Sequence, residues 1–321
     1  MTPMELAATS LPFATFLVLA GAVMLGFGSS WLVSGASRLA LGLGVTPMVV
    51  GLTVVGFGTS MPELSVSVLA ALRGSSGLSL GNAVGSNIMN LLLVLGVAAL
   101  VRPIDVVGGG KVLHRDLVFG VLPALVLVAA SWNGFIGRLE ALTLVAIFTV
   151  FLIVAIRVAR AGRDEPVEVS GSPLWNASLT FVGIAVLVWG ADLMVRGGVS
   201  MAHRFGISDA VIGLTLVAFG TSLPELATSV AASLKEQSAL SVGNVLGSNI
   251  FNLGLIVGLA FAIRPASVPV FVIRQDIPLL IGVTLLVGLG ILRDGKISRG
   301  EGALLLAIYA VYFAFLAHRG G

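Results

Sequence analysis

The fold is decided by a motif that occurs twice, as GLTVVGFGTSMPEL from Gly51 to Leu64 and as GLTLVAFGTSLPEL from Gly213 to Leu226. A second pair lies at the same offset of 162 residues, GNAVGSNIMN from Gly81 and GNVLGSNIFN from Gly243. Of the 53 positions from Gly51 to Pro103, 31 are identical to their partners at this offset. Because the matches include Thr, Ser, Pro, Glu and Asn, shared hydrophobicity does not explain them. The chain therefore contains two copies of one unit.

The composition places both copies in a membrane. Of the 321 residues, 57% are hydrophobic and 10% are charged, whereas roughly a quarter are charged in a typical soluble domain. The mean hydropathy of +1.08 and the 41 glycines fit spanning helices, in which small residues allow close packing. The first apolar run, from Leu11 to Val33, is too long for a cleaved signal peptide and is interpreted as the first span.

Cutting the chain at its Gly, Pro and charge clusters yields segments of about 20 apolar residues, the length that a hydrocarbon core of about 30 Å requires. We predict ten spans, at 11–33, 38–72, 79–101, 114–131, 138–160, 173–195, 207–234, 240–263, 271–292 and 299–317. The second and seventh are long enough to tilt or break. The sequence thus predicts an all-α polytopic membrane protein with ten transmembrane helices in two five-helix repeats, residues 1–160 and 173–321, joined by a linker at 161–172.

The second repeat is expected to be inverted, because an odd number of spans separates equivalent points of the two copies. Inverted-topology repeats are typical of secondary transporters, whose substrate site lies near the membrane midplane at the repeat interface. If the N-terminus and the C-terminus are both outside, 11 of the 18 Lys and Arg residues fall in cytoplasmic connectors, in accord with the positive-inside rule. This orientation makes the linker cytoplasmic.

Glu63 and Glu225 stand inside long apolar segments, where an ionised carboxylate costs at least about 2.5 kcal/mol. No Lys or Arg lies within nine residues of Glu63, so a bound cation, a proton or a water-filled cavity must compensate for its charge. Each Glu follows a proline, Pro62 or Pro224, which removes one helical hydrogen bond and frees carbonyl oxygens. A proline kink of purely structural importance is the alternative. We expect a hard oxygen set suited to Ca²⁺ or Na⁺, made of both carboxylates, the carbonyls of Thr59 and Thr221 and the hydroxyls of Ser60 and Ser222.

The second motif places Asn, Ser and Asn at spacings of four, which stacks them on one helix face. The members that we expect to line the site are Ser86, Asn90, Ser248 and Asn252. Asn87 and Asn249 fall off that face, and for them packing between helices is an equally good interpretation.

The paired GTSxPE and GNxxGSNIxN motifs resemble the α-repeats of the cation/Ca²⁺ antiporter superfamily, and the short, loop-poor chain resembles its prokaryotic Na⁺/Ca²⁺ exchangers. The resemblance implies multi-pass insertion in a prokaryotic plasma (inner) membrane. It implies Ca²⁺ ligands at Glu63, Glu225 and the backbone oxygens of Thr59 and Thr221. It implies flanking Na⁺ sites at the carbonyls of Gly56 and Ala218 with Ser60, Ser86, Ser222 and Ser248, and a central position lined by Asn90 and Asn252.

One departure from the superfamily concerns charge. Several Na⁺/Ca²⁺ and K⁺-dependent members have Asp where this chain has Asn90 or Asn252, so only two carboxylates are expected to face the site. One Ca²⁺, two Na⁺ or two H⁺ would neutralise them, whereas a third Na⁺ would leave the site positive. The charge count leaves Na⁺ and H⁺ open as counter-ion, and the resemblance implies an antiporter that exchanges Ca²⁺ for Na⁺ by alternating access. A Ca²⁺/H⁺ antiporter on the same scaffold is the alternative.

Other functional classes fit the sequence less well. An ion channel needs a continuous pore and filter rings that two pseudo-symmetric halves do not supply. No nucleophile pair, His ligand set or cofactor motif accompanies the glutamates, which argues against an enzyme. Scattered basic residues argue against nucleic acid, and no ATP-binding motif is present. The expected partners are the transported ions and the lipid bilayer, without a cofactor, and a monomer is compatible with this interpretation.

Overall fold

The computed structural model describes residues 10–105, 110–130, 134–161, 170–205 and 218–320. The helices and π-helical turns before the linker are α2 (Leu11–Gly42), α3 (Pro47–Val50), η1 (Gly51–Val55), α4 (Gly56–Thr59), α5 (Met61–Leu72), α6 (Ser76–Met89), η2 (Asn90–Val94), α7 (Leu95–Val101), α8 (Gly110–Ala130) and α9 (Arg138–Ala161). Those after it are α10 (Pro173–Arg204), α12 (Ala218–Thr221), α13 (Leu223–Leu234), α14 (Ser238–Phe251), η5 (Asn252–Ile256), α15 (Val257–Ile263), η6 (Val272–Asp276), α16 (Ile277–Asp294) and α17 (Arg299–Gly320). Four short strands are β1 (Ile104–Asp105), β2 (Phe135–Ile136), β3 (Ala266–Ser267) and β4 (Lys296–Ile297).

Seven of the described helices are long and apolar enough to cross a membrane. An eighth is counted when the bent pair Pro47–Thr59 and Met61–Leu72 is taken as one span. Two predicted spans lie outside this count. The described apolar part of α8, Leu117–Ala129, is shorter than a span, and the segment expected at 207–234 lies partly outside the described residues.

The boundary expected between the first two spans is wrong, because α2 continues beyond Val33 and includes residues 38–42. The small residues of this stretch do not break a helix. The chain turns only at Gly44, whose φ of 64° favours glycine, and Pro47 begins the next helix. In the same way, α10 runs past the expected end at residue 195 to Arg204.

The second span is broken, as its proline predicts. The axes of the helices on either side of Ser60 differ by 48°. Pro62 lies in the first turn of α5, where its missing N–H has no helical acceptor. The second copy repeats the break at Ser222. Gly58 itself lies inside α4, where an added Cβ would clash with Ile184 of α10, so this glycine allows close packing and does not make the break.

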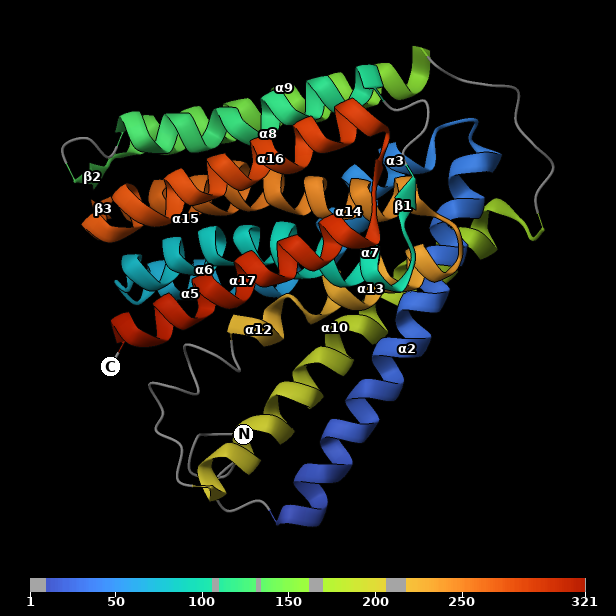
Figure 1. Ribbon diagram of the computed structural model, residues 1–321, viewed down its shortest axis with the longest axis horizontal. Coiled ribbons are helices and arrows are strands. Elements are labelled where there is room, and N and C mark those ends of the chain that lie inside the picture. The colour runs from blue at the N-terminus through green and yellow to red at the C-terminus, as the bar shows by residue number, and fades with distance from the viewer. Residues whose placement is uncertain (1–9, 106–109, 131–133, 162–169, 206–217, 321) are drawn as a thin grey trace.

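α2 and α10 lie side by side and extend away from the other helices (Figure 1). Glycines at every seventh position form the contact, and they are Gly21, Gly28 and Gly35 on α2 and Gly183, Gly190 and Gly197 on α10. A Cβ added at Gly28 would lie 2.8 Å from the Leu187 nitrogen and 3.0 Å from the Gly183 oxygen. Gly21 meets Gly190 in the same way, so the helices are antiparallel and touch backbone to backbone.

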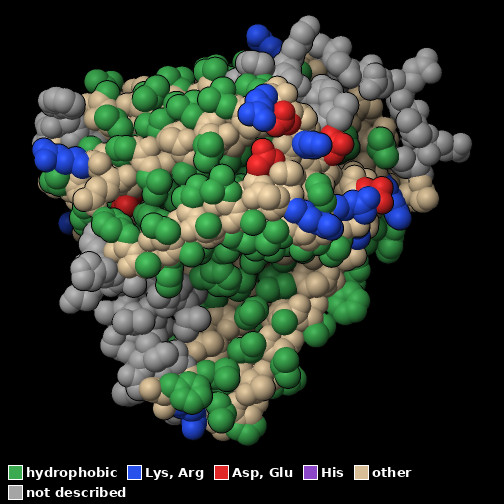
Figure 2. Space-filling model, in the orientation of Figure 1, with side chains coloured by type: hydrophobic (Ala, Val, Ile, Leu, Met, Phe, Trp, Pro, Cys, Tyr) green, Lys and Arg blue, Asp and Glu red, His purple; other side chains and the backbone are tan. Residues whose placement is uncertain are grey.

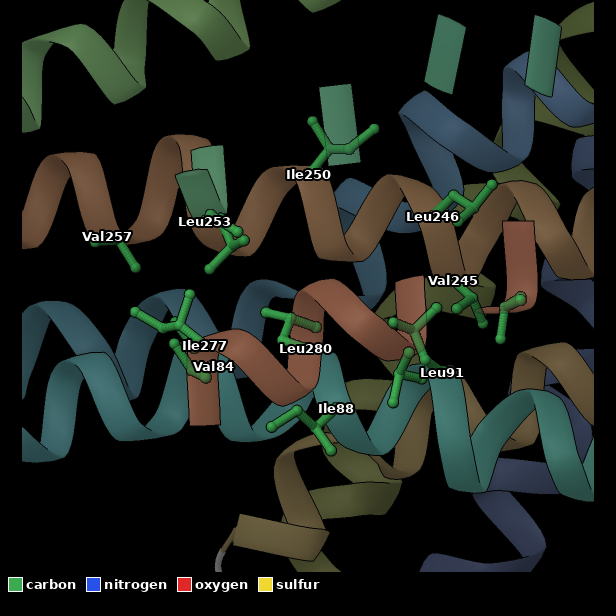
Figure 3. Close-up of a cluster of buried hydrophobic side chains, with 14 of the residues drawn as sticks. Val84, Ile88, Leu91, Val245, Leu246, Ile250, Leu253, Val257, Ile277 and Leu280 are labelled. Carbon is green, nitrogen blue, oxygen red and sulfur yellow. The ribbon is translucent and has the colours of Figure 1, made fainter. Parts of the chain in front are cut away.

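The core of the remaining helices lies where α6 and η2 face α14, η5 and α15, with α16 packed beside them (Figure 3). Its buried side chains include Val84, Ile88, Leu91, Val245, Leu246, Ile250, Leu253, Val257, Ile277 and Leu280. The strand pairs β1 with β4 and β2 with β3 join connectors from the two halves of the chain. The core helices are thereby tied together at two separate places.

Hydrophobic side chains cover much of the visible outer surface, while Lys, Arg, Asp and Glu gather mainly near one edge (Figure 2). Large exposed apolar residues include Leu139 on α9, Leu174 on α10 and Val311 on α17. A surface of this kind, on helices long enough to span, is that of a multi-pass membrane protein.

Candidate cation site

Glu63 and Glu225 each lie in the first turn after a helix break, and both are fully buried. The Ser60 hydroxyl donates a hydrogen bond of 3.0 Å to Oε1 of Glu225. The Ser222 hydroxyl donates one of 3.1 Å to Oε1 of Glu63. Each carboxylate is therefore held by the serine at the other copy's break.

Further polar groups surround Glu225. The Ser248 hydroxyl lies 3.3 Å from Oε1 of Glu225 and 3.3 Å from the Gly56 carbonyl oxygen. Thr59 donates from Oγ1 to Oδ1 of Asn244 at 3.0 Å and lies 3.4 Å from the Ser248 hydroxyl. The structure thus brings together four predicted site residues from both copies, and Asn244 positions the Thr59 side chain.

Asn90 and Asn252 are fully buried and begin the π-helical turns η2 and η5, a local geometry that is frequent at functional sites. Nδ2 of Asn90 donates to Oδ1 of Asn249 at 3.1 Å, and Nδ2 of Asn252 donates to Oδ1 of Asn87 at 2.9 Å. Asn87 and Asn249 in turn donate to each other's backbone carbonyls, at 2.9 and 3.2 Å. Because a carbonyl can only accept, this network fixes the orientation of all four amides.

The helix-face argument left the role of Asn87 and Asn249 open between site lining and packing between helices, and the hydrogen bonds that join them are contacts between helices. Their partners come from the other copy, so the spacing within one helix does not reveal them. The available signal was their identity at the repeat offset. They position the Asn90 and Asn252 amides.

Ten buried side-chain oxygens lack a hydrogen-bond partner among the described residues. Four of them belong to the predicted site, and they are Oε2 of Glu63, Oε2 of Glu225, Oδ1 of Asn90 and Oδ1 of Asn252. Leaving a buried acceptor without a partner costs about 1–3 kcal/mol, and more for a charged group. A bound cation can serve as the missing partner of a buried oxygen. Hard cations such as Ca²⁺ and Na⁺ prefer oxygen ligands of this kind. Within the described ranges no three His, Asp or Glu side chains gather, so the two carboxylates supply the negative charge here.

The other predicted site residues lie close to these groups in the chain. Thr221 and Ser86 are buried, and Ala218 begins α12, although its side chain lies outside what the structure describes. Asn82 donates to the Glu63 carbonyl at 3.2 Å, and its counterpart Asn244 donates to the Glu225 carbonyl at 3.4 Å. These two amides fix the backbone that carries each glutamate.

A cavity of about 670 Å³ reaches the edge of the site from between α5 and α10. Its lining includes Pro62 and Ser65 of α5, Asp192 and Val195 of α10, and Thr221 at the second break. The cavity therefore connects a predicted ligand with a charged side chain in the second half of α10.

Comparison with known proteins identifies the family to which these features correspond. The family model described as sodium/calcium exchanger protein matches residues 13–157 and 175–317. The putative antiporter CaxA of Alkalimonas amylolytica is 37% identical over 311 residues, covering 93% of this chain and 97% of that protein. The sodium/calcium exchanger MaX1 of Methanosarcina acetivorans is 32% identical over 342 residues, covering 94% and 97%. A solved structure of the sodium-calcium exchanger NCX_Mj, soaked with Na⁺ and Sr²⁺, has a TM-score of 0.84 and 33% identity, covering 95% of this chain and 99% of that one.

Proposed function

This chain belongs to the sodium/calcium exchanger protein family, a family of membrane antiporters, and we propose that it exchanges Ca²⁺ for Na⁺ by alternating access at a site centred on Glu63 and Glu225. The observation that carries the proposal is the set of four buried oxygens without donors, two from carboxylates and two from amides. An empty site of this kind is costly to bury, and a bound cation removes that cost.

We assign the ligands from this geometry together with the resemblance of the motifs. Ca²⁺ takes the carboxylates of Glu63 and Glu225 with the backbone oxygens of Thr59 and Thr221. The Na⁺ ligands are the carbonyls of Gly56 and Ala218 and the hydroxyls of Ser60, Ser86, Ser222 and Ser248. Asn90 and Asn252 line the central position through Oδ1.

The proposed architecture is ten spans in two inverted five-helix repeats, residues 1–160 and 173–321, joined by a cytoplasmic linker at 161–172, with both termini outside a prokaryotic plasma membrane. Reciprocal contacts across the offset of 162 residues, such as Ser60 to Glu225 and Ser222 to Glu63, support two equivalent units. The proposed unit of transport is the monomer, because one chain supplies both carboxylates.

The site charge provides a mechanism for obligatory exchange. Two unneutralised carboxylates are expensive to enclose in a medium of low dielectric constant, whereas one Ca²⁺ or two Na⁺ leave the site neutral. The conformational change should therefore proceed mainly with ions bound. We assign the movement to α2 and α10, which slide together across the helices that carry the site.

The counter-ion is tested by ⁴⁵Ca²⁺ flux into proteoliposomes under imposed gradients. Outwardly directed Na⁺ should drive ⁴⁵Ca²⁺ uptake at equal pH on both sides, and an outwardly directed H⁺ gradient without Na⁺ should not. Uptake driven by H⁺ alone would establish the Ca²⁺/H⁺ alternative. Uptake that follows the Ca²⁺ gradient without any counter-ion would indicate a channel and contradict the proposal.

A further inference from the structure

Lys235 follows α13, the helix that carries Glu225, and it is bound to α2. Its Nζ lies 2.7 Å from the carbonyl oxygen of Ser30, 2.7 Å from the hydroxyl of Ser30 and 2.7 Å from the hydroxyl of Ser34. An ammonium group has three protons, so these three acceptors use its whole donor capacity. The contact forms although Arg38, one turn further along α2, acts on Lys235 as a like charge.

The contact of Lys235 with α2 holds α2 closed against α13. α2 packs along α13, and Ala227 on α13 is packed against the cluster that includes Val33 of α2. The equivalent helix pair in the other copy is α10 with α5, and these two make little direct contact. The cavity of about 670 Å³ lies between them instead, and Ser65, the counterpart of Ala227, is exposed in its lining.

The repeat offset of 162 residues relates the contact to a second set of residues. Ser30 corresponds to Asp192, Ser34 to Arg196 and Lys235 to Arg73. In this conformation Asp192 pairs with Arg196 on its own helix at 2.7 Å. Arg73 is exposed and pairs with no group in the ranges that the structure describes.

We propose that Lys235 with Ser30 and Ser34, and Arg73 with Asp192, are two alternative closing contacts, each of which holds one of the two conformations of the transport cycle. If α10 moved onto α5 as α2 now lies on α13, the Arg73 guanidinium would occupy the position equivalent to Lys235, opposite Asp192 in place of Ser30. Arg196 would then lose its partner to Arg73. The inference rests on alternating access as proposed above, and it gives Lys235 and Arg73 a positioning role outside the ion site.

The two closing contacts also differ in chemistry. The contact seen here joins an ammonium to neutral oxygens, whereas the alternative joins a guanidinium to a carboxylate and can be bidentate.

The experiment uses the absence of cysteine from the sequence. Single cysteines are introduced as Ala227→Cys or Ser65→Cys, and their reaction rates with a hydrophilic maleimide are measured on protein in nanodiscs, where both faces are accessible. Lys235→Met should raise the ratio of the rate at position 227 to the rate at position 65 by about tenfold, as expected for losing a charge-assisted set of hydrogen bonds. Lys235→Arg should restore much of the original ratio. Arg73→Met should change the ratio in the opposite direction.

Unfolding would raise both rates together, so the ratio separates a shift between conformations from a loss of structure. An unchanged ratio in Lys235→Met, or an equal rise at both positions, would overturn the closing contacts. Because no gradient is used, labelling tests them independently of ⁴⁵Ca²⁺ flux. Normal ⁴⁵Ca²⁺ flux with an unchanged ratio of labelling rates would contradict only the closing contacts. Absence of exchange in the wild-type protein would contradict the proposed function.

Discussion

Replacing Glu63 by Gln tests whether the Glu63 carboxylate binds ions or has only a structural role. Gln keeps the shape of the side chain and an Oε1 that can accept from Ser222, now 3.1 Å from the Glu63 carboxylate. The change removes one of the two negative charges and places an amide on the side of Oε2, which has no donor within the described residues.

The expected loss of Ca²⁺ affinity follows from Coulomb's law. Two unit charges 4 Å apart interact by about 4 kcal/mol at an effective dielectric constant of 20, so a divalent ion gains about 8 kcal/mol from one carboxylate. If desolvation cancels half of this, about 4 kcal/mol remains, which is about a thousandfold in affinity. Gradient-driven ⁴⁵Ca²⁺ uptake should fall below detection at micromolar Ca²⁺.

The stability of the ion-free protein should change in the opposite direction. A buried carboxylate in a spanning segment costs at least about 2.5 kcal/mol, so its removal should raise the melting temperature without ions by roughly 5 °C. Ca²⁺ should raise the melting temperature of the wild-type protein and leave that of Glu63→Gln unchanged. Thermal unfolding in detergent with and without Ca²⁺ measures both effects.

Glu301→Gln is the matched control, because Glu301 caps α17 by accepting from Ser298 and lies outside the site. This variant should lose stability and keep its response to Ca²⁺. The ion-site assignment is wrong if Glu63→Gln melts below the wild-type protein without ions and is still stabilised by Ca²⁺.

Three further variants test other parts of the structure. Asn249→Ala removes the acceptor of the Asn90 amide, so Oδ1 of Asn90 is no longer oriented. The apparent KM for Ca²⁺ should then rise about tenfold in the flux assay. An unchanged KM would refute the positioning role of Asn249. Gly28→Ala inserts a Cβ 2.8 Å from the Leu187 nitrogen and should lower the free energy of unfolding by about 1–3 kcal/mol, as thermal unfolding would show. Gly26→Ala in the same helix is the control, because its Cβ meets no atom within 4 Å and should leave the free energy of unfolding unchanged. Asn90→Asp places an acceptor against Oδ1 of Asn249 and adds a third carboxyl group to the site. Na⁺-driven ⁴⁵Ca²⁺ uptake should therefore fall at neutral pH and partly recover in acid, where a protonated Asp can donate. Uptake at the wild-type level that does not depend on pH would contradict this reasoning.

The sequence allowed the membrane class, the family and the helix break to be predicted, because each depends on local composition or on motif identity. Pro62 and Pro224 predict breaks wherever their helices lie in space. The contact between Ser60 and Glu225 could not be predicted in this way, because the repeat offset shows which residues are equivalent and not which ones touch. The same reason explains why the role of Asn87 and Asn249 stayed open, since each binds its own counterpart in the other copy.

Helix ends were the other feature that the sequence left open. Small residues after Val33 are compatible with a connector or with a helix that packs closely against another, and only the presence of α10 decides between the two. The glycines of α2 that face α10 are contact positions between the two helices. Burial against a partner helix, which sequence periodicity does not reveal, keeps α2 helical beyond Val33, where Gly35 packs against Asn176 and Thr180 of α10.

The contacts also indicate which parts can move relative to each other. The strand pairs β1 with β4 and β2 with β3 fix connectors of one half to those of the other, so the core helices cannot separate without breaking backbone hydrogen bonds. α2 and α10 touch through glycines at backbone distance, and sliding one along the other would drive side chains into the neighbouring backbone. The pair should therefore move as one unit against the core, and a movement that opens α2 from α13 must bring α10 toward α5. Such coupling makes simultaneous opening on both sides unfavourable, which is the condition that an exchanger needs to avoid leak.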